Sequence, residues 1–490
     1  MKLMYPLAAA IAVCAMSSAS LAQMPPSKIA LNGARIIPIV GDEIAEGTIV
    51  IERGKITAIG QMGEVDIPFD AMEVDLEGMV VMPGFIHACS SSGLDRSNES
   101  LPVTPYLDVY DATDPSSLFF EQALRSGITA VHVMQGPNTV IGGVSRLVRP
   151  IGLSMDEMSI RGDLAMVIST SPRGGFDRMA QIATLREAFF DLDAAIDALA
   201  EKRYEEEQAK DDKDVNVSPA EARDLGKELI RDEDYNDGVY NLVRLRRGEL
   251  SPWVYAGAAM DVAPAIEIMD SQDVLDQTVF ILSGDSFKAA PQIAATGRPV
   301  VIGPDLTYRE RDPMSGKLDE TFLPKMFYDA GVMFAMLPNE SGAFAERYPT
   351  FNAAQCVRNG IPRQTALEAI TINPAKILGV DEAFGSIEVG KTANLVVLSG
   401  DPLDFNSWVE QSYIDGILAY DREKDSRLRE LLESGEMGEE APADEQADAA
   451  ATDESAPADA PAGDSGGAGD GSGDGAGDGS GDGSGSGEGR

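Results

Sequence analysis

Short apolar runs alternate with helix-like stretches between Gly84 and Gly379, and this alternation restricts the possible folds more than any other feature of the chain. The strand-like run ITAVHVM follows the helix-like SLFFEQALRSG, and the later apolar runs are LAMVIST, WVYAG, TVFILSG, PVVIGP and VMFAML. Repeated strand-then-helix units are typical of a parallel sheet. At this length a (β/α)8 TIM-like barrel is the most economical closure, so we predict an α/β fold with a barrel over residues 83–379.

Strand-like segments also flank the barrel region on both sides. Before it, GTIVIERGKITAIG alternates apolar residues around Arg53-Gly54, which is typical of a hairpin with a glycine turn. After it, GSIEVGKTANLVVLSGDPLD and ILAYDRE are again strand-like. We therefore predict one composite β-sandwich domain built from residues 23–82 and residues 380–425.

A charged segment interrupts the barrel pattern at residues 194–247. It includes EKRYEEEQAKDDKD and SPAEARDLGKELIRDEDYND, which have few core-forming positions, and Ser218 with Glu221 forms a capping box. We predict an insertion of solvated helices. A lid over the barrel mouth is the alternative.

The amino terminus has the pattern of an export signal. Lys2 supplies a positive charge, an apolar run covers Leu7 to Met16, and Ser20-Leu21-Ala22 is a small-x-small cleavage site. We therefore predict a signal peptide over residues 1–22 and an exported, periplasmic or extracellular protein, with an uncleaved anchor as the alternative. No later segment is long and apolar enough to span a membrane.

The carboxyl terminus and the overall charge restrict the possible partners. Residues 433–490 are rich in Ala, Gly, Ser, Pro, Asp and Glu and contain a single basic residue, Arg490, so we predict a disordered acidic tail. The formal charge of −42 repels nucleic acid and anionic membranes. A small-molecule ligand and a second protein chain are the partners that stay open.

Without the signal segment the chain keeps two cysteines, Cys89 and Cys356. An oxidising compartment permits a disulfide between them. Their wide separation in the sequence gives no evidence that they meet, so two buried thiols are the preferred interpretation.

Four stretches resemble the amidohydrolase superfamily, in particular its secreted imidazolonepropionase-like members. The signature of the family's first strand resembles MVVMPGFIHACSSSG, and its second strand with the following loop resembles GITAVHVMQGPNTVIGGVSRLVRP. The helix pair that closes the family's barrel resembles GIPRQTALEAITINPAKILGV, and its last strands resemble FGSIEVGKTANLVVLSGDPLD. The resemblance covers residues 28–420. It implies a metal-capable (β/α)8 barrel and, by descent, a hydrolase of non-peptide C–N bonds such as those of cyclic amides.

The resemblance also implies where metal ligands belong. Such enzymes use Zn2+ to polarise a carbonyl and to lower the pKa of a bound water, and Zn2+ prefers imidazole or thiolate ligands. In this chain the His-x-His frame of strand one holds Cys89 and Ser91. The histidines of strands five and six align with Tyr255 and Ser283, and the aspartate of strand eight, which binds metal and acts as general base, aligns with Asn339.

The histidine content of the chain argues against a zinc site even without an alignment. The chain has two histidines, His87 and His132, which are too few for a histidine-rich zinc site. An amide at Asn339 cannot accept a proton near pH 7, so the general-base role is lost as well. We therefore expect no cofactor, with His87 and Cys89 as weak candidates for a metal site. His132 lies within a strand and is interpreted as a core residue.

The segment GPNTVIGG, residues 136–143, is interpreted as a ligand-binding loop, because its glycines free backbone N–H groups to face the cavity. A purely structural loop is the alternative. Arg146 and Arg149 follow and are candidates to pair with a substrate carboxylate. The predicted substrate-binding residues are Gly136, Asn138, Gly142 and Gly143.

Three functions stay open. The first is a catalytically impaired amidohydrolase that binds a ligand, or that pairs with itself or with an active relative. The second is an active hydrolase with an atypical metal site or with Cys89 as nucleophile, for which His87 on the same strand face is the nearest base. The third is an envelope protein that uses only its surface and acidic tail. The residues favour the first, without deciding whether catalysis is retained.

Overall fold

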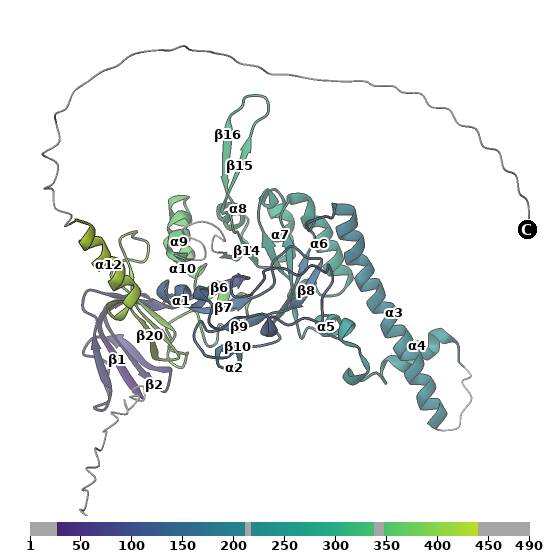
Figure 1. The fold of residues 1–490 in the computed structure, drawn as a ribbon, viewed down its shortest axis with the longest axis horizontal. Helices are drawn as coiled ribbons and strands as arrows, with labels where there is room; N and C mark the ends of the chain where they lie inside the picture. The colour runs from purple at the N-terminus through teal and green to yellow at the C-terminus, as the bar shows by residue number, and fades with distance from the viewer. Residues whose placement is uncertain (1–26, 211–216, 338–346, 440–490) are drawn as a thin grey trace, which may run out of the picture. The chain divides into compact units, whose positions relative to one another are not determined.

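The computed structural model describes residues 27–210, 217–337 and 347–439 (Figure 1). The chain divides into two compact units, residues 1–429 and 430–490, and helix α12 (Ser426–Glu439) contains the described part of the second. The predicted signal peptide, Asn339 and residues 440–490 of the predicted tail lie outside the described residues, whereas residues 433–439, also predicted to be disordered, form the end of α12. Among the described helices, none is long and apolar enough to cross a bilayer.

One eight-stranded sheet contains strands from both ends of the chain. Inside it β5 (Val80–Pro83) runs antiparallel to β18 (Leu395–Leu398). The apolar alternation around Arg53-Gly54 forms the hairpin of β2 and β3, as the sequence predicts. The order is β20-β19-β18-β5-β1-β2-β3, with β4 paired to β1. The remaining bounds are β1 (Lys28–Ile36), β2 (Ile44–Glu52), β3 (Lys55–Gln61), β4 (Met72–Asp75), β19 (Val409–Ile414) and β20 (Ile417–Asp421).

Five parallel strands form the main arc of the barrel region. Helices connect them and nearly all of their residues are buried, which explains why the sequence shows continuous apolar runs rather than alternation. The strands are β11 (Ala165–Ser169), β12 (Ser251–Ala256), β13 (Val279–Leu282), β14 (Val300–Ile302) and β17 (Phe334–Met336). Helices along this arc include α3 (Arg178–Lys210), α6 (Ala259–Ser271), α7 (Ala290–Thr296) and α8 (Leu323–Asp329).

A separate four-stranded sheet holds the first two strands of the barrel region. β6 (Phe85–Ser90) and β7 (Ile128–Val133) are parallel, and α1 (Leu118–Arg125) lies between them in the chain. The Ser117 side chain accepts a hydrogen bond from the Phe119 N–H and so caps α1. On its other side β7 pairs antiparallel with β9 (Arg146–Val148), which pairs with β10 (Ser159–Arg161).

The predicted closed barrel is not present in the described residues, because the sheets are mixed and open. The segment from β8 (Ile141–Val144) to β9 fills the position between β7 and β11, but it runs antiparallel to both. Only residues 134–140 separate β7 from β8, which is too short for the crossover that a parallel neighbour needs. At the other end β17 approaches β6 without a hydrogen-bonded ladder between them. The fold is therefore mixed α/β.

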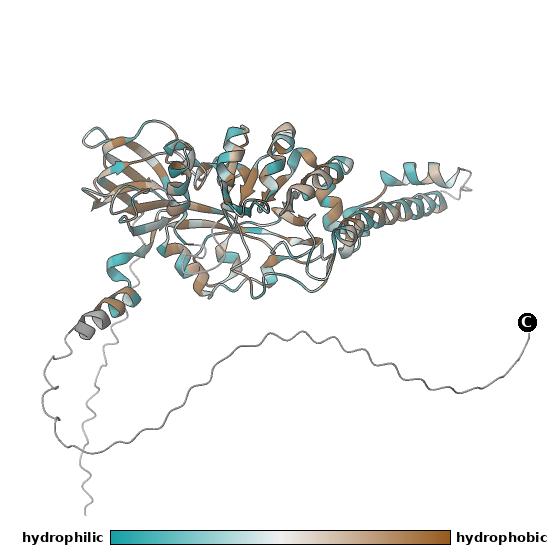
Figure 2. Cartoon of the chain, turned by 90° about the horizontal axis from the view of Figure 1, so that it is seen from above, coloured by the Kyte–Doolittle hydropathy of each residue, from teal (hydrophilic) through white to brown (hydrophobic). Residues whose placement is uncertain are grey.

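The charged segment predicted as an insertion at residues 194–247 begins inside a longer helix. α3 continues from Arg178 to Lys210, α4 (Pro219–Lys227) packs back against it, and α5 (Asp237–Arg246) precedes β12. Ser218 caps α4 by accepting from the Glu221 N–H. The arm of α3 and α4 projects away from the strands in Figures 1 and 2. A helix that follows a strand runs back along the sheet, so the far end of α3 lies away from the carboxyl edge and is not a lid over it.

A two-stranded hairpin, β15 (Thr307–Arg311) and β16 (Leu318–Phe322), follows β14 and stands apart from the other sheets (Figure 1). The remaining helices are α2 (Met155–Met158), α9 (Pro349–Arg358), α10 (Arg363–Glu368) and α11 (Ile372–Ile377). Short 3-10 helices lie at Val109–Asp111, Asp232–Asp234, Leu275–Gln277, Ser286–Ala289 and Arg422–Lys424.

Candidate functional site

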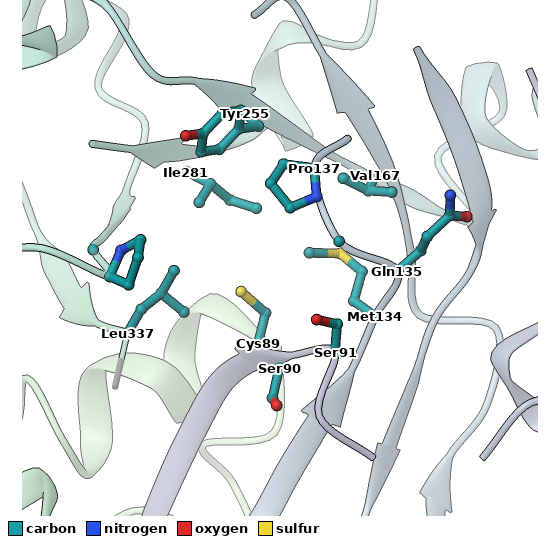
Figure 3. A pocket seen from close by; sticks show the side chains of 13 residues that line it. Cys89, Ser90, Ser91, Met134, Gln135, Pro137, Val167, Tyr255, Ile281 and Leu337 are labelled. Carbon is teal, nitrogen blue, oxygen red and sulfur yellow. The ribbon is translucent and has the colours of Figure 1, made fainter. Parts of the chain in front are cut away.

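A cavity of about 160 Å3 lies at the carboxyl edge of the strands (Figure 3). Residues in or just after β6, β7, β11, β12, β13, β14 and β17 contribute to its wall, so both open sheets converge on it, as strands do at the carboxyl face of a barrel. Its wall is mostly apolar. The lining residues are Cys89, Ser90, Ser91, Met134, Gln135, Gly136, Pro137, Val167, Tyr255, Ile281, Gly303, Pro304 and Leu337.

Cys89 and Ser91, the two positions of the His-x-His frame, both line this cavity. Cys89 is 8% exposed, and Figure 3 shows its sulfur directed toward the cavity. The Ser90 hydroxyl accepts a hydrogen bond of 3.1 Å from the Ser92 N–H, which turns the chain as it leaves β6. The structure therefore brings both predicted positions to one surface.

Tyr255 lines the same cavity from β12, and Ser283 lies beside it just after β13. Their hydroxyl oxygens are 2.9 Å apart and form a hydrogen bond. The packing around the phenol is close, since a Cβ on Gly257 would lie 2.9 Å from the Tyr255 hydroxyl oxygen. The two positions where the resemblance expects histidines are thus joined as a pair of hydroxyl groups.

A buried carboxylate supports the loop that follows β12. Asp261 is 1% exposed and accepts from Arg178 Nε and from the Ser171 hydroxyl, each at 2.6 Å, and from the Ala258 N–H at 3.1 Å. The Ser171 hydroxyl oxygen also accepts from the Gly257 N–H at 2.7 Å. This network ties the start of α3 and the start of α6 to the end of β12, and it fixes the backbone next to Tyr255.

His87 is buried but does not line the cavity. Its ring packs beside Phe119 of α1, with centroids 6.4 Å apart, and neither ring nitrogen has a hydrogen-bond partner among the described residues. Burial lowers the pKa of His87 to about 3, so the imidazole is neutral. The expected shared face of His87 and Cys89 is not seen, because the register with β7 shifts between His87 and Ser90 and strict alternation is lost. His87 is therefore not placed as a base for Cys89.

His132 is a fully satisfied core residue, as its position within a strand predicts. Its Nδ1 lies 2.7 Å from the Ala88 carbonyl oxygen, and its Nε2 lies 2.7 Å from the Ser145 hydroxyl oxygen. Its ring packs edge-on against Trp253 with centroids 4.5 Å apart. Burial lowers the pKa of His132 to about 4. The histidine therefore connects β6 and the β8–β9 segment to β7 and is engaged away from the cavity.

No disulfide joins Cys89 and Cys356, and both are buried. Cys356 lies on α9, where its Sγ is 3.3 Å from the Met336 Sδ. Burial raises the pKa of the Cys356 thiol to about 12. The two cysteines are thus buried thiols, as the sequence interpretation prefers.

Residues 136–143 divide between the cavity and the sheet. Gly136 lines the cavity, whereas Gly142 and Gly143 lie within β8, and the Gly143 N–H donates to Gln135 Oε1 at 3.1 Å. Asn138 Oδ1 accepts from the Gly174 N–H at 2.6 Å. A Cβ on Gly143 would lie 2.6 Å from the Leu107 carbonyl oxygen, so this glycine permits a close backbone approach. Among the four predicted binding residues, Gly136 is the one that the structure puts at the cavity.

Arg146 and Arg149 already have carboxylate partners within the protein. Arg146 Nη2 lies 2.8 Å from Asp108 Oδ2, and Arg149 Nη1 lies 2.7 Å from Asp415 Oδ2. The interpretation that they pair with a substrate carboxylate is therefore not supported, since each guanidinium serves as a contact between segments of the chain.

Sequence reasoning missed the apolar residues that make up most of the cavity wall. Met134, Ile281 and Leu337 each belong to a strand-like run that the sequence displays. Their positions near the carboxyl ends of those runs were the available signal, because side chains there line the mouth of a parallel barrel.

The donors at the cavity do not fit a zinc centre. Zn2+ prefers imidazole nitrogen, thiolate and carboxylate ligands. The described wall offers one thiol, from Cys89, together with hydroxyl groups and an amide. Across the described ranges no group of three or more His, Cys, Asp or Glu side chains is arranged to hold a metal ion.

Comparison with known proteins connects this architecture to a family. The sequence profile of the Amidohydrolase family matches residues 350–420. The chain is 25% identical over 431 residues to the imidazolonepropionase of Thermoplasma volcanium, which covers 79% of this chain and 94% of that protein. It is 22% identical over 409 residues to the amidohydrolase tasK of Hapsidospora irregularis, which covers 76% of this chain. That match spans 40% of the length of tasK.

A solved structure agrees with these relatives. The crystal structure of an amidohydrolase from Thermotoga maritima superposes with a TM-score of 0.65 at 26% sequence identity, covering 80% of this chain and 100% of the other. The profile match, the imidazolonepropionase similarity and this structural similarity agree with one another. Together they support the amidohydrolase superfamily as the family of this chain.

Proposed function

We propose that this protein is an exported, ligand-binding member of the superfamily that has lost metal-dependent hydrolysis of non-peptide C–N bonds. The observation that carries the proposal is the hydrogen bond between Tyr255 and Ser283, at the two positions where the resemblance expects imidazole ligands. A hydroxyl pair that bonds internally lacks the imidazole nitrogens that zinc prefers. Cys89 and Ser91 at the strand-one frame support the same conclusion.

The cavity suits a small, largely apolar ligand with a few polar atoms. Its volume is about 160 Å3, and Met134, Val167, Ile281 and Leu337 supply apolar wall. The Ser91 and Tyr255 hydroxyl groups at the same wall are possible hydrogen-bond partners for a carbonyl or amide group. A cyclic amide, the substrate type that the family resemblance implies, meets both requirements.

The arrangement of the sheets supports descent from a closed (β/α)8 barrel. β6 and β7, the β8–β9 segment and the five-stranded arc follow one another in the order of barrel strands. The β8–β9 segment is antiparallel to its neighbours, and β17 meets β6 without a hydrogen-bonded ladder. We regard the two open sheets as an opened form of that barrel, in which the carboxyl-edge cavity is retained.

The alternative function is an active hydrolase that uses an atypical metal site or Cys89 chemistry. Cys89 lines the cavity, but a cysteine nucleophile needs a nearby base. His87 packs beside Phe119, and His132 is bonded to Ala88 and Ser145. Neither described histidine is therefore in position to serve, and we place this alternative second.

Two measurements on the purified protein test the proposal. The first is metal content by mass spectrometry after loading with zinc or manganese and dialysis, for which we expect far less than one ion per chain. The second is thermal unfolding with 2-pyrrolidinone or hydantoin, for which we expect a raised midpoint. Cys89→Met, whose longer side chain extends into the cavity, should abolish that rise while leaving the ligand-free midpoint near the native value.

The outcomes separate the candidate functions. One tightly held transition metal per chain, together with hydrolysis of a cyclic amide, would replace our proposal with the active enzyme. Binding that survives Cys89→Met would place the ligand elsewhere. Export is tested independently by amino-terminal sequencing of the protein from the cell envelope, where we expect the chain to begin after Ala22.

A further inference from the structure

The β15–β16 hairpin has few contacts with the rest of the protein. Its strands pair from Thr307–Phe322 to Arg311–Leu318, and most of their side chains are exposed. Contacts at the base include the ring of Tyr308, which packs against Phe287 with centroids 5.8 Å apart. Near the tip, Met314 is 95% exposed. A two-stranded ribbon with this little support is marginally stable in water, so it gains from a partner.

A cleft of about 370 Å3 lies near the base of this hairpin. Its wall includes Tyr348, Phe351, Phe405 and Trp408, all four of them exposed. Phe405 is 73% exposed and Trp408 is 46% exposed. Four aromatic side chains gathered on a surface are typical of an interaction site rather than of scattered surface residues. We call this the aromatic cleft.

The hairpin and the aromatic cleft lie on the same side of the protein. A third, polar cavity is lined by Thr307 and Arg309 at the hairpin base and also by Phe351 of the cleft. Because the two features adjoin, a twofold axis beside them can place each hairpin near the other protomer's cleft. Such an arrangement is self-complementary, as a closed dimer requires.

Unpaired charges near the two features are complementary. Arg311, at the end of β15, donates to the Gly316 carbonyl oxygen but forms no ion pair with any described residue. Asp404, in the cleft wall, accepts from the Asn406 N–H and likewise forms no ion pair within the described ranges. The hairpin thus offers a guanidinium and the cleft offers a carboxylate, in addition to a methionine for the aromatic rings.

We propose that the protein forms a twofold dimer in which the hairpin tip of each protomer inserts into the aromatic cleft of the other. Met314 contacts the Phe405 and Trp408 rings, since a thioether packs favourably against aromatic side chains. Arg311 pairs with Asp404 across the interface. The dimer buries the exposed methionine and the aromatic side chains, and it supplies the support that the hairpin lacks within one chain.

Sedimentation velocity over a range of protein concentrations tests the dimer. We expect Met314→Asp and Trp408→Ala each to raise the dimer dissociation constant by about tenfold or more, as residues at an interface centre do. The matched control is Met179→Asp on α3, because Met179 is also strongly exposed but lies far along the chain from both features. Circular dichroism checks that each variant is folded.

A charge exchange tests the orientation of the two chains. Arg311→Glu and Asp404→Arg should each weaken the dimer by placing like charges together, and the combination of both in one chain should restore it. Rescue requires that the two positions meet, which a loss of folding or a general effect of charge does not produce.

Tryptophan fluorescence gives a second readout. The chain has two tryptophans, and Trp253 is 1% exposed in the core, so Trp408 is the one that changes environment on docking. We expect the emission to shift to the blue with rising concentration in the native protein and in Met179→Asp, but not in Met314→Asp. A protein that stays monomeric at its highest soluble concentration would overturn the proposal. So would a dimer that Met314→Asp and Trp408→Ala leave intact, or one that the charge exchange fails to rescue.

Discussion

The Tyr255 hydroxyl oxygen lies 2.9 Å from the Ser283 hydroxyl oxygen, across two adjacent parallel strands that end at the same cavity. Each side chain satisfies the other. The pair therefore acts as a structural contact at a place where the superfamily resemblance leads one to expect separate metal ligands.

Tyr255→Phe should cost about 1 kcal/mol in the free energy of unfolding, because it removes one partly buried hydrogen bond and leaves the ring in place. Urea denaturation measures this difference. Ser283→Ala should cost about as much, and the double variant should cost less than the sum of the two, since both changes remove the same bond. Strict additivity would show that the two hydroxyl groups do not stabilise each other.

Asp261→Ala should destabilise the protein by about 3 kcal/mol, because it removes a buried carboxylate that accepts several hydrogen bonds, and bonds to a charged group contribute more than neutral ones. The donors of these bonds are Arg178, Ser171 and the Ala258 N–H. Glu267→Ala is the control on the same helix. Its carboxylate is mostly exposed and pairs with Arg186 at the surface, so its loss should cost about 0.5 kcal/mol or less. Equal midpoints in urea for the two variants would contradict the assigned role of Asp261.

Gly143→Ala should destabilise the protein by about 1–3 kcal/mol, since the new methyl group would press on the backbone carbonyl of Leu107. Gly238→Ala is expected to have the opposite sign, with a gain of up to about 1 kcal/mol. Gly238 lies within α5, and its new Cβ would meet only the movable Asn236 side chain, at 3.0 Å. Thermal unfolding measures both effects. The unfolding midpoint should fall in Gly143→Ala and rise in Gly238→Ala, and two shifts of the same sign would contradict this prediction.

His132→Gln should make the free energy of unfolding fall less steeply as the pH is lowered from about 6.5 to about 4. Burial lowers the pKa of His132 to about 4 in the folded protein, whereas an unfolded histidine titrates near 6.5. Between these values the unfolded chain binds a proton that the folded chain does not, so the free energy of unfolding falls as the pH falls from about 6.5 to about 4. The contribution is up to about 1.4 kcal/mol per pH unit for one histidine.

Carboxylates also weaken the fold in acid, so the measurement is the difference between the native and variant slopes over that window. Glutamine is neutral throughout and keeps an N–H group that can donate toward the Ala88 carbonyl oxygen. Parallel stability curves for the two proteins from pH 6.5 to pH 4 would mean that His132 does not titrate as its burial requires.

The strands of the arc could be predicted from the sequence because burial on both sides leaves a run of apolar residues. LAMVIST and WVYAG became β11 and β12, and ITAVHVM became β7. The same logic did not reveal the direction of the β8–β9 segment, since an apolar run looks alike in a parallel and an antiparallel strand. The short link over residues 134–140 contained that information, because it leaves no length for a crossover helix.

The sequence predicted which residues form the candidate site better than it predicted how their side chains are arranged. Cys89, Ser91 and Tyr255 meet at one cavity, but the packing of His87 beside Phe119 depends on a register shift that alternation along a strand cannot show. Arg146 and Arg149 illustrate the same limit. Their carboxylate partners, Asp108 and Asp415, come from distant segments that only the folded chain brings near.

The eight-stranded sheet has a consequence for the order of synthesis. β5 leaves the ribosome early, yet its neighbour β18 begins at Leu395, after the whole barrel region. Until then one edge of β5 has no strand to pair with, and completing the sheet requires a contact of very long sequence separation. The first five strands therefore gain their last neighbours only after the whole barrel region has been made, and a chain that stops short of β18 exposes an edge on which other chains can add.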